Sequence, residues 1–302
     1  MKVLICDPLA ESAIARLREA GLEVVERTGM SPEELAAELA KGYEAIVVRS
    51  ATKVRKAAID AAMGLKLIVR AGVGLDNIDV EYAREKGIQV RNTPRASTDS
   101  VAELALAHML ALARSLPQAT ISLREGKWEK KAFKGIELSG KTLGVIGIGR
   151  IGQAVARRAL CLGMRVVAFD KFVKESPLPE VRMVSLEELL READFITLHV
   201  PADPAGPVIG QREIALMKDG AYLINCARGG VVDEAALLSA LNSGKLAGAG
   251  LDVFEEEPPQ NMELLRHPKV SLTPHIGAQT KEAQARVGDE VVDILLEFAR
   301  SS

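Results

Sequence analysis

The sequence predicts an α/β protein with two doubly wound domains, each built around a parallel sheet. Three observations support this prediction. Short apolar runs alternate with stretches of helical periodicity, and such continuous runs are typical of buried parallel strands. A glycine-rich turn, from Gly147 to Gly152, opens a second series of the same kind. The length of 302 residues gives room for two domains, each with its own core.

The first series contains five expected strands. Helical stretches separate them, and one of these begins with the N-cap residue Ser31 followed by Pro32 at the first helical position. An apolar run, a helix and another apolar run form the βαβ pattern. The first 90 or so residues therefore predict one five-stranded α/β unit. The expected strands cover residues 3–5, 23–25, 45–48, 67–69 and 88–90.

Two helices, over 98–112 and 117–125, and a basic segment, over 127–134, come before the second series. A long final helix over 280–299 follows its last strand, and we expect this helix to pack back on the first unit. The first domain is then discontinuous in sequence. The expected strands of the second series cover residues 142–146, 165–169, 195–200, 221–225, 246–251 and 270–272.

The composition excludes several classes of protein. Apolar residues make up 48% and charged residues 26%, and 39 basic side chains stand against 41 acidic ones. This balance creates no field that attracts nucleic acid or an anionic membrane. The apolar run before Asp7 is too short for a signal peptide, and no apolar stretch reaches the roughly 18 residues of a membrane span. The three cysteines, Cys6, Cys161 and Cys226, are far apart and predict neither disulfides nor zinc, so we expect a cytoplasmic protein.

The glycine-rich turn predicts a nucleotide site. A strand, the pattern GxGxxG and a helix follow one another, and the next strand ends in Asp170. Gly147 makes the tight turn, Gly149 lets the backbone approach a pyrophosphate, and Gly152 permits close packing of the helix on the strand. The carboxylate of Asp170 can accept hydrogen bonds from a ribose and repels a 2′-phosphate. This full context predicts a Rossmann domain that binds NAD in preference to NADP.

Hydride transfer at an alcohol carbon also needs a proton carrier, and His275 is the best of the four histidines. It follows a strand and is held by Pro274 and a small turn. His108 lies in an apolar helix and is expected in the core. His199 is expected as structural support beside the cofactor, and His267 as a surface loop residue.

Glu257, directly before two prolines, is expected to stabilise the protonated imidazole of His275 and to fix its orientation. Glu255 and Glu256 are interpreted as solvated loop charges. Arg228 stands between an alanine and two glycines, where its planar fork can bind a carboxylate. The alternative for Arg228 is a helix-capping or ion-pair role toward Asp233 and Glu234.

Taken together, these motifs resemble the NAD-dependent D-2-hydroxyacid dehydrogenase family over essentially the whole chain. The matching stretches are 48–54, 70–77, 92–94, 147–152, 225–234, 250–259 and 274–278. The resemblance implies a flavodoxin-like substrate-binding domain over 1–92 plus 280–302 and an NAD-binding Rossmann domain over 93–279. It also implies a homodimer formed through the latter. The chain ends after the final helix, and we expect no regulatory domain.

The resemblance also assigns roles. It implies that Arg228 binds the substrate carboxylate, and that His275 and Glu257 carry out proton transfer. Asp252 is placed near the nicotinamide carboxamide. Residues that follow the strands are expected to line NAD beside the glycine turn, namely Arg150, Ile151, His199, Val200, Pro201, Cys226, Ala227, Gly277 and Ala278. The expected substrate-binding residues are Arg49, Ser50, Lys53, Gly72, Val73, Gly74 and Lys130.

The cations Arg49, Lys53 and Lys130 favour a phosphorylated 2-hydroxy acid of three carbons, because such a substrate needs a cationic pocket. The alternative for Lys130 is a solvated basic loop. An enzyme of the same family that reduces glyoxylate or hydroxypyruvate is the closest alternative function, and an NAD(H)-sensing corepressor is a distant one. Val73 and Val200 stand where hydroxyl residues often occur in the family, and the segment 201–210 is one residue shorter than usual.

Overall fold

In the computed structural model, residues 1–301 are described and divide into two compact units. One unit comprises Met1–Ser97 together with the chain from Ala278 on, and the other comprises Thr98–Gly277. The expected boundaries lay at 92/93 and 279/280. The first observed boundary lies later because the chain after the fifth strand still bonds within the first unit: the Thr93 N–H donates to Gly72 O, and Arg286 Nε donates to Ala96 O.

The first unit contains a five-stranded parallel sheet in the order β2-β1-β3-β4-β5, which is the order of flavodoxin-like folds. Strands that follow β1 are added first on one side of it, as β2, and then on the other, as β3 to β5. The segments after β1 and β3 therefore lead away in opposite directions from adjacent carboxyl ends of the sheet. Its strands are β1 (Lys2–Ile5), β2 (Glu23–Glu26), β3 (Ala45–Val48), β4 (Leu67–Arg70) and β5 (Gln89–Asn92). Its helices are α1 (Glu11–Glu19), α2 (Pro32–Leu39), α3 (Lys56–Ala61), α4 (Val80–Glu85) and α12 (Lys281–Ser301).

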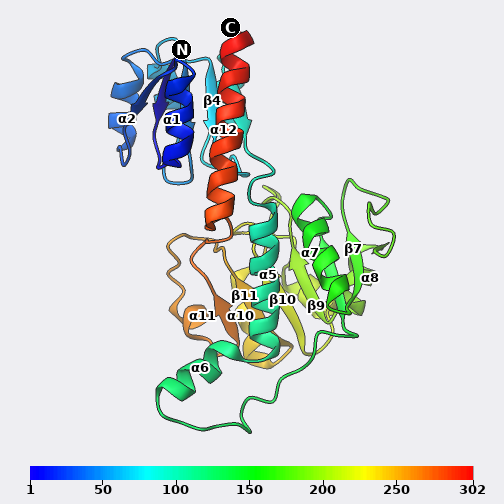
Figure 1. Ribbon diagram of the computed structural model, residues 1–302. Helices are drawn as coiled ribbons and strands as arrows, with labels where there is room; N and C mark the ends of the chain where they lie inside the picture. The colour runs from blue at the N-terminus through cyan, green and yellow to red at the C-terminus, as the bar shows by residue number, and fades with distance from the viewer. Residues whose placement is uncertain (302) are drawn as a thin grey trace. The chain divides into compact units, whose positions relative to one another are not determined.

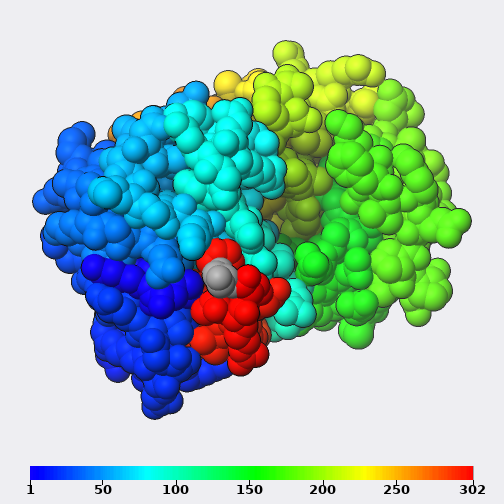
Figure 2. Space-filling model, turned by 90° about the horizontal axis from the view of Figure 1, so that it is seen from above, coloured from blue at the N-terminus to red at the C-terminus, as the bar shows by residue number. Residues whose placement is uncertain are grey.

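Helices cover both faces of this sheet. Alternate residues of β1 point to opposite faces, so Val3 joins one apolar core and Leu4 joins the other. The final helix α12 packs on the first face, where a Cβ at Gly288 would lie 3.0 Å from Ala13 Cβ of α1. Figure 2 shows the end of α12, in red, among the blue and cyan segments of the same unit. The expected return of this helix to the first unit is what the structure shows.

The second unit contains a seven-stranded parallel sheet in the order β12-β11-β10-β9-β6-β7-β8. The order in which strands are added to the sheet reverses between β6 and β9. These two strands are neighbours, so Gly147 and His199 follow adjacent strands. Its strands are β6 (Thr142–Ile146), β7 (Arg165–Phe169), β8 (Arg182–Met183), β9 (Phe195–Leu198), β10 (Ala221–Asn225), β11 (Leu246–Leu251) and β12 (Val270–Leu272). Its helices are α5 (Thr98–Ala113), α6 (Leu116–Arg124), α7 (Arg150–Cys161), α8 (Leu186–Glu192), α9 (Gln211–Leu216), α10 (Glu234–Ser243) and α11 (Met262–Arg266).

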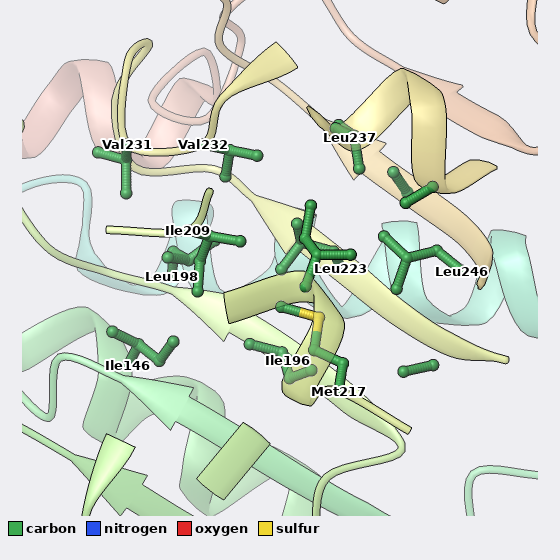
Figure 3. Close-up of a cluster of buried hydrophobic side chains, with 14 of the residues drawn as sticks. Ile146, Ile196, Leu198, Ile209, Met217, Leu223, Val231, Val232, Leu237 and Leu246 are labelled. Atoms are coloured by element: carbon green, nitrogen blue, oxygen red, sulfur yellow. The ribbon is translucent and has the colours of Figure 1, made fainter. Parts of the chain in front are cut away.

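Two apolar cores cover the faces of the seven-stranded sheet. Helices α5 and α7 lie side by side on one face (Figure 1), and their core includes Met109 and Val155. The other core gathers side chains such as Ile196, Leu223 and Leu237 between the sheet and α8, α9 and α10 (Figure 3). Within residues 1–301 no helix combines the length and the apolar character needed to cross a membrane.

The sequence expectations differ from the structure at a few element ends. β8 was not expected, because two residues are too short to show a pattern. β9 ends at Leu198 rather than at residue 200. Ser31 caps α2 as expected, and its hydroxyl accepts from the Glu34 N–H while Glu34 bonds back to the Ser31 N–H.

Candidate active site

The turn between β6 and α7 is built from three glycines with different environments. Gly147 has a φ of +93°, and a Cβ there would lie 2.5 Å from His199 O. A Cβ at Gly152 would lie 2.0 Å from Gly147 O, so the helix approaches the turn closely. At Gly149, by contrast, nothing lies within 4 Å of the added carbon. Two glycines therefore serve the packing of the turn, and the third keeps the space in front of it open.

The start of α7 fits an anionic ligand. Gly149 is its N-cap and provides no side chain, so no capping hydrogen bond covers the first N–H groups of this 12-residue helix. Arg150 and Ile151 supply the first helical positions. Uncovered N–H groups and the positive end of the helix dipole bind phosphate. The residues present therefore fit the pyrophosphate of a dinucleotide.

Asp170 lies at the end of β7 beside the same turn. Its Oδ2 accepts from the Ile148 N–H at 3.0 Å, and its Oδ1 accepts from the N–H groups of Phe172 and Val173. Burial favours the neutral acid, but these three donors outweigh it and lower the pKa of Asp170 below its ordinary value. The carboxylate is ionised at neutral pH, and Oδ2, which accepts only one of these bonds, keeps a lone pair for a ribose hydroxyl.

His275 and Glu257 form a carboxylate–imidazole pair. The Nδ1 atom of His275 lies 2.7 Å from Oε2 of Glu257, and the Phe254 N–H donates to the other carboxylate oxygen. Both side chains are about half buried, at 45% and 38% exposure. Because the carboxylate accepts, Nδ1 carries a proton, and Nε2 is the ring nitrogen left for proton exchange with a substrate.

The buried carboxylate of Asp252 shapes the turn that carries His275. Asp252 is 1% exposed, and its two oxygens accept from the Ile276 and Gly277 N–H groups, each at 2.8 Å. Its backbone oxygen accepts from the His275 N–H, and Thr273 Oγ1 donates to Oδ1 at 2.6 Å. His275 has a φ of +52°, a conformation that costs free energy in a residue with a Cβ. Asp252 therefore stabilises a backbone turn that the chain would not adopt alone.

The other histidines are held neutral. Burial lowers the pKa of His199 to about 3, and its Nε2 bonds to Thr197 Oγ1. Burial also lowers the pKa of His108, which lies in the core. The pKa of His267 is lowered by desolvation and by Lys269. Of the four, His275 alone has a carboxylate bonded to its ring in the part of the chain that the structure describes.

Arg228 stands on a loop fixed by Asn225 at the end of β10. The Asn225 amide donates to Arg228 O and its Oδ1 accepts from the Ala227 N–H. A Cβ at Gly229 would lie 1.8 Å from Phe254 O, so this loop touches the segment that leads to Glu257.

The two acids named as alternative partners of Arg228 both accept from backbone N–H groups. Asp233 caps α10 through the Ala236 N–H, and Glu234 accepts from the Glu255 N–H. The carboxylate of Glu255 in turn accepts from the Glu234 N–H, so Glu255 is bonded and not only solvated, as we had expected. Arg228 Nη1 donates to Ala227 O at 2.7 Å.

Among the residues expected beside the cofactor, Cys226 is an inert side chain. Burial, assisted by the charge of Asp252, raises the pKa of its thiol. Ala227 is also buried, and Val200 packs against the glycine turn, where its Cγ1 would lie 2.7 Å from a Cβ at Gly147. These three positions expected beside the cofactor therefore carry small or apolar side chains. Pro201 follows them on the exposed surface.

In the first unit, the side chains of Asp7 and Asn77 hold the loop from Arg49 to Thr52 by hydrogen bonds. The carboxylate of Asp7, 4% exposed, accepts from the Arg49 and Thr52 N–H groups and from Thr52 Oγ1. The Asn77 amide donates to Arg49 O and to Thr52 O. Ser50 and Lys53 are exposed on this fixed loop, and Arg49 Nη1 donates to Pro8 O.

The loop from Gly72 to Gly74 is fixed in a similar way. Asn92 Nδ2 donates to Val73 O at 2.6 Å, and Thr93 N donates to Gly72 O. Gly72 has a φ of +150°, and a Cβ there would overlap the guanidinium of Arg70. The two loops of the first unit are thus held by buried or partly buried polar side chains of the same unit.

The family model described as D-isomer specific 2-hydroxyacid dehydrogenase, NAD binding domain, matches residues 106–277. The chain is 52% identical to the D-3-phosphoglycerate dehydrogenase of Methanocaldococcus jannaschii, over 99% of this chain and 58% of that protein. It is 51% identical to the hydroxypyruvate reductase of Thermotoga maritima, over 97% of this chain and 96% of that protein.

The chain belongs to the D-isomer specific 2-hydroxyacid dehydrogenase family. Among solved structures, the D-lactate dehydrogenase of Aquifex aeolicus complexed with NAD and lactic acid superposes with a TM-score of 0.88 at 34% identity, covering 100% of this chain and 96% of that one. The second unit contains the NAD-binding domain of the family, and NAD is its cofactor. The chain spans only a little over half of the length of the first two curated relatives, 58% of each.

Several residues that shape the site were missed from the sequence. Asp7, Asn77, Asn92 and Asn225 bond to the backbone of a loop that carries an expected site residue, and Thr273 bonds to the carboxylate of Asp252. Four of the five had a signal, a short polar side chain at or just after the end of an apolar run. Asn77 had none, because it lies seven residues after the end of β4.

The glycine turn generates a first prediction. We expect Gly149→Ala to leave the fold intact and to weaken NADH binding by about tenfold, because its Cβ meets no protein atom but enters the space of the pyrophosphate. Gly152→Ala forces the helix off the turn and should cost about 1–3 kcal/mol of stability. Thermal unfolding and NADH fluorescence titration measure the two effects.

Gly210→Ala is the matched control, because a Cβ there meets only Glu213 Oε2 at an ordinary 3.5 Å. Equal thermal destabilisation by the Gly149 and Gly152 variants would contradict the division of roles.

Proposed function

We propose that this chain catalyses NAD-linked oxidation of D-3-phosphoglycerate to 3-phosphohydroxypyruvate, the entry step to serine synthesis. The observation that carries the proposal is the bond between His275 Nδ1 and Glu257, on a turn clamped by Asp252 in the NAD-binding domain. The names of the relatives from Methanocaldococcus jannaschii and Archaeoglobus fulgidus, both D-3-phosphoglycerate dehydrogenases, support the substrate.

The roles of the side chains follow from their chemistry. Bound NAD supplies the hydride acceptor for the carbon that carries the hydroxyl. His275 Nε2 takes the hydroxyl proton, so hydride and proton leave the alcohol together and a ketone, NADH and a proton result. Glu257 stabilises the imidazolium that forms and keeps its ring oriented. Arg228 binds the substrate carboxylate with its planar fork and polarises the neighbouring oxygen.

Anion binding is assigned to the fixed loops of the first unit. Backbone N–H groups from Gly72 to Gly74 bind the substrate carboxylate in this proposal. The phosphate is bound by Arg49, Ser50 and Lys53, on or next to the loop that Asp7 and Asn77 hold, and by Lys130 of the basic segment. Lys127 pairs with Glu125, whereas no ion pair of Lys130 with a residue in the range 1–301 is described. Cations on a rigid backbone lose little entropy on binding an anion.

A second candidate is reduction of hydroxypyruvate or glyoxylate. The hydroxypyruvate reductase of Thermotoga maritima favours it, because that protein matches this chain over nearly its whole length. Both candidates use the same proton carrier and the same cofactor domain. They differ in whether the substrate phosphate contributes to binding.

The deciding experiment compares substrates on one preparation. We expect NADH formation from D-3-phosphoglycerate at mildly alkaline pH to exceed NADH or NADPH oxidation with hydroxypyruvate and glyoxylate. Lys53→Ala and Lys130→Ala should each raise KM for the phosphorylated acid about tenfold and leave KM for hydroxypyruvate unchanged. Added salt should act in the same direction. Turnover with unphosphorylated acids alone would establish the second candidate.

Variants of the proton-transfer pair give a second prediction. His275→Ala should abolish turnover and keep NADH binding. Glu257→Gln removes the charge that stabilises the imidazolium formed when His275 takes the hydroxyl proton, so it should lower kcat about tenfold and leave NADH binding unchanged. His267→Ala, at a histidine with no carboxylate bonded to its ring, is the control. Near-normal turnover by His275→Ala would refute the proton-transfer role.

We also propose that the chain forms a homodimer through its second unit. Large apolar side chains remain exposed on and beside α6: Ile121 at 54%, Leu123 at 58% and Trp128 at 82%. Exposed apolar patches of this kind mark interfaces between proteins.

Ile121→Glu combined with Leu123→Glu should convert the dimer to a monomer in light scattering. Met63→Glu, at a similarly exposed residue of the first unit, should leave the dimer intact. A dimer that persists in the double variant would place the interface elsewhere.

A further inference from the structure

His108 is a polar side chain in the apolar interior between α5 and the sheet. It is 2% exposed, and its neighbours on the helix are residues such as Leu106 and Met109. A Cβ at Gly250 of β11 would lie 2.7 Å from His108 Cβ, so the helix crosses the strand in close contact. A buried imidazole at such a position is costly unless both ring nitrogens are bonded.

Both ring nitrogens are bonded to hydroxyl groups of the chain at β12. His108 Nδ1 lies 2.9 Å from Ser271 Oγ, and Nε2 lies 3.1 Å from Thr273 Oγ1. Thr273 Oγ1 in turn lies 2.6 Å from Asp252 Oδ1. Four side chains therefore form one continuous hydrogen-bonded row from the strand to the buried carboxylate.

The direction of every bond in this row is determined. The carboxylate of Asp252 can only accept, so the single hydroxyl proton of Thr273 points to it. Thr273 Oγ1 must then accept from His108, which places the ring proton on Nε2. Nδ1 is left as an acceptor, and Ser271 donates to it. Burial lowers the pKa of His108 and the charge of Asp252 opposes this only in part, which agrees with a neutral ring.

We propose that His108 is a positioning residue for hydride transfer: its neutral Nε2–H fixes the Thr273 hydroxyl, which fixes Asp252 and the turn that carries His275. The inference rests on the proposed function, and it adds a residue about which the sequence indicated only a place in the core. The link to chemistry is short. Of the three hydrogen bonds that the structure describes for the Asp252 carboxylate, one comes from Thr273 and the other two hold Ile276 and Gly277.

Loss of the His108 donor frees the Thr273 hydroxyl to rotate away from Asp252. The carboxylate, which is 1% exposed, then loses a donor in a buried site, where such bonds are strong. His275 and the nicotinamide carboxamide expected at Asp252 both lose their fixed geometry. The substrate carboxylate, bound by other groups, is unaffected, so the kinetic effect should fall on kcat and on cofactor affinity rather than on KM for the acid.

Three substitutions separate this role from packing. Gln at position 108 can place an amide donor where Nε2 lies, whereas Asn reaches only the position of Nδ1 and Leu bonds to neither hydroxyl. We expect His108→Asn and His108→Leu to lower kcat about tenfold and to weaken NADH binding about fivefold. KM for the acid should stay within about twofold, and His108→Gln should restore most of kcat. Met109→Leu, a conservative change at the next residue of the same helix, should alter neither quantity.

Thr273 provides an independent test that does not depend on how position 108 packs. Thr273→Val cuts the row and should reproduce the kcat loss of His108→Leu, whereas Thr273→Ser keeps the hydroxyl and should not. The double variant His108→Leu/Thr273→Val should lose no more than either single variant, because both changes break the same row.

A kcat and NADH affinity within about twofold of the parent in both His108→Asn and His108→Leu, with only a lower Tm, would overturn the proposal. Additive losses in the double variant would overturn it as well. If the parent chain turns over none of the acids, the proposed function fails separately. NADH affinity across the same variants then decides whether the row positions Asp252.

Discussion

The turn that carries His275 depends on one buried carboxylate. Asp252 takes the N–H groups of Ile276 and Gly277 and thereby holds His275 at a φ of +52°. No cation bonded to Asp252 is described within residues 1–301; hydroxyl and backbone N–H dipoles stabilise it instead. Fixed dipoles around a buried charge allow little rearrangement, which is the property a site needs when charge develops during reaction. Glu257 can then orient a ring whose backbone is already in place.

The same arrangement recurs in the first unit. Asp7 and Asn77 hold the N–H and C=O groups of the Arg49–Thr52 loop, as Asn225 holds the loop of Arg228. In each case a short polar side chain, at a strand end for Asp7 and Asn225 and in a loop for Asn77, satisfies backbone groups that the sheet leaves unpaired. These side chains hold irregular loops against the ends of the strands. His275, proposed as the proton carrier, and Lys53, proposed to bind phosphate, thus stand on or directly beside backbone held by hydrogen bonds within the chain.

Much of the fold could be predicted from the sequence because its strands are continuous apolar runs. The bounds of β6, β7, β10, β11 and β12 agree with the expected ranges, and the turn from Gly147 to Gly152 lies where expected. The two-residue strand β8 was missed because it has no periodicity. The pair of Glu257 and His275 was also anticipated, since a carboxylate before two prolines and a histidine after a strand both have local signals. The row from Ser271 through His108 had none, because His108 lies 163 positions from Ser271 and 165 from Thr273 in sequence.

In the proposed reaction, the choice of substrate depends on a different part of the chain from catalysis. There, His275, Glu257 and Arg228 act on the hydroxyl, carbonyl and carboxylate that every 2-hydroxy acid has, so they do not distinguish one acid from another. Asp7 and Asn77 bond only to groups of the Arg49–Thr52 loop, so the geometry of that loop is equally independent of the acid. The proposal therefore leaves discrimination to exposed cations such as Lys53, whose gain on pairing with a phosphate is absent for hydroxypyruvate.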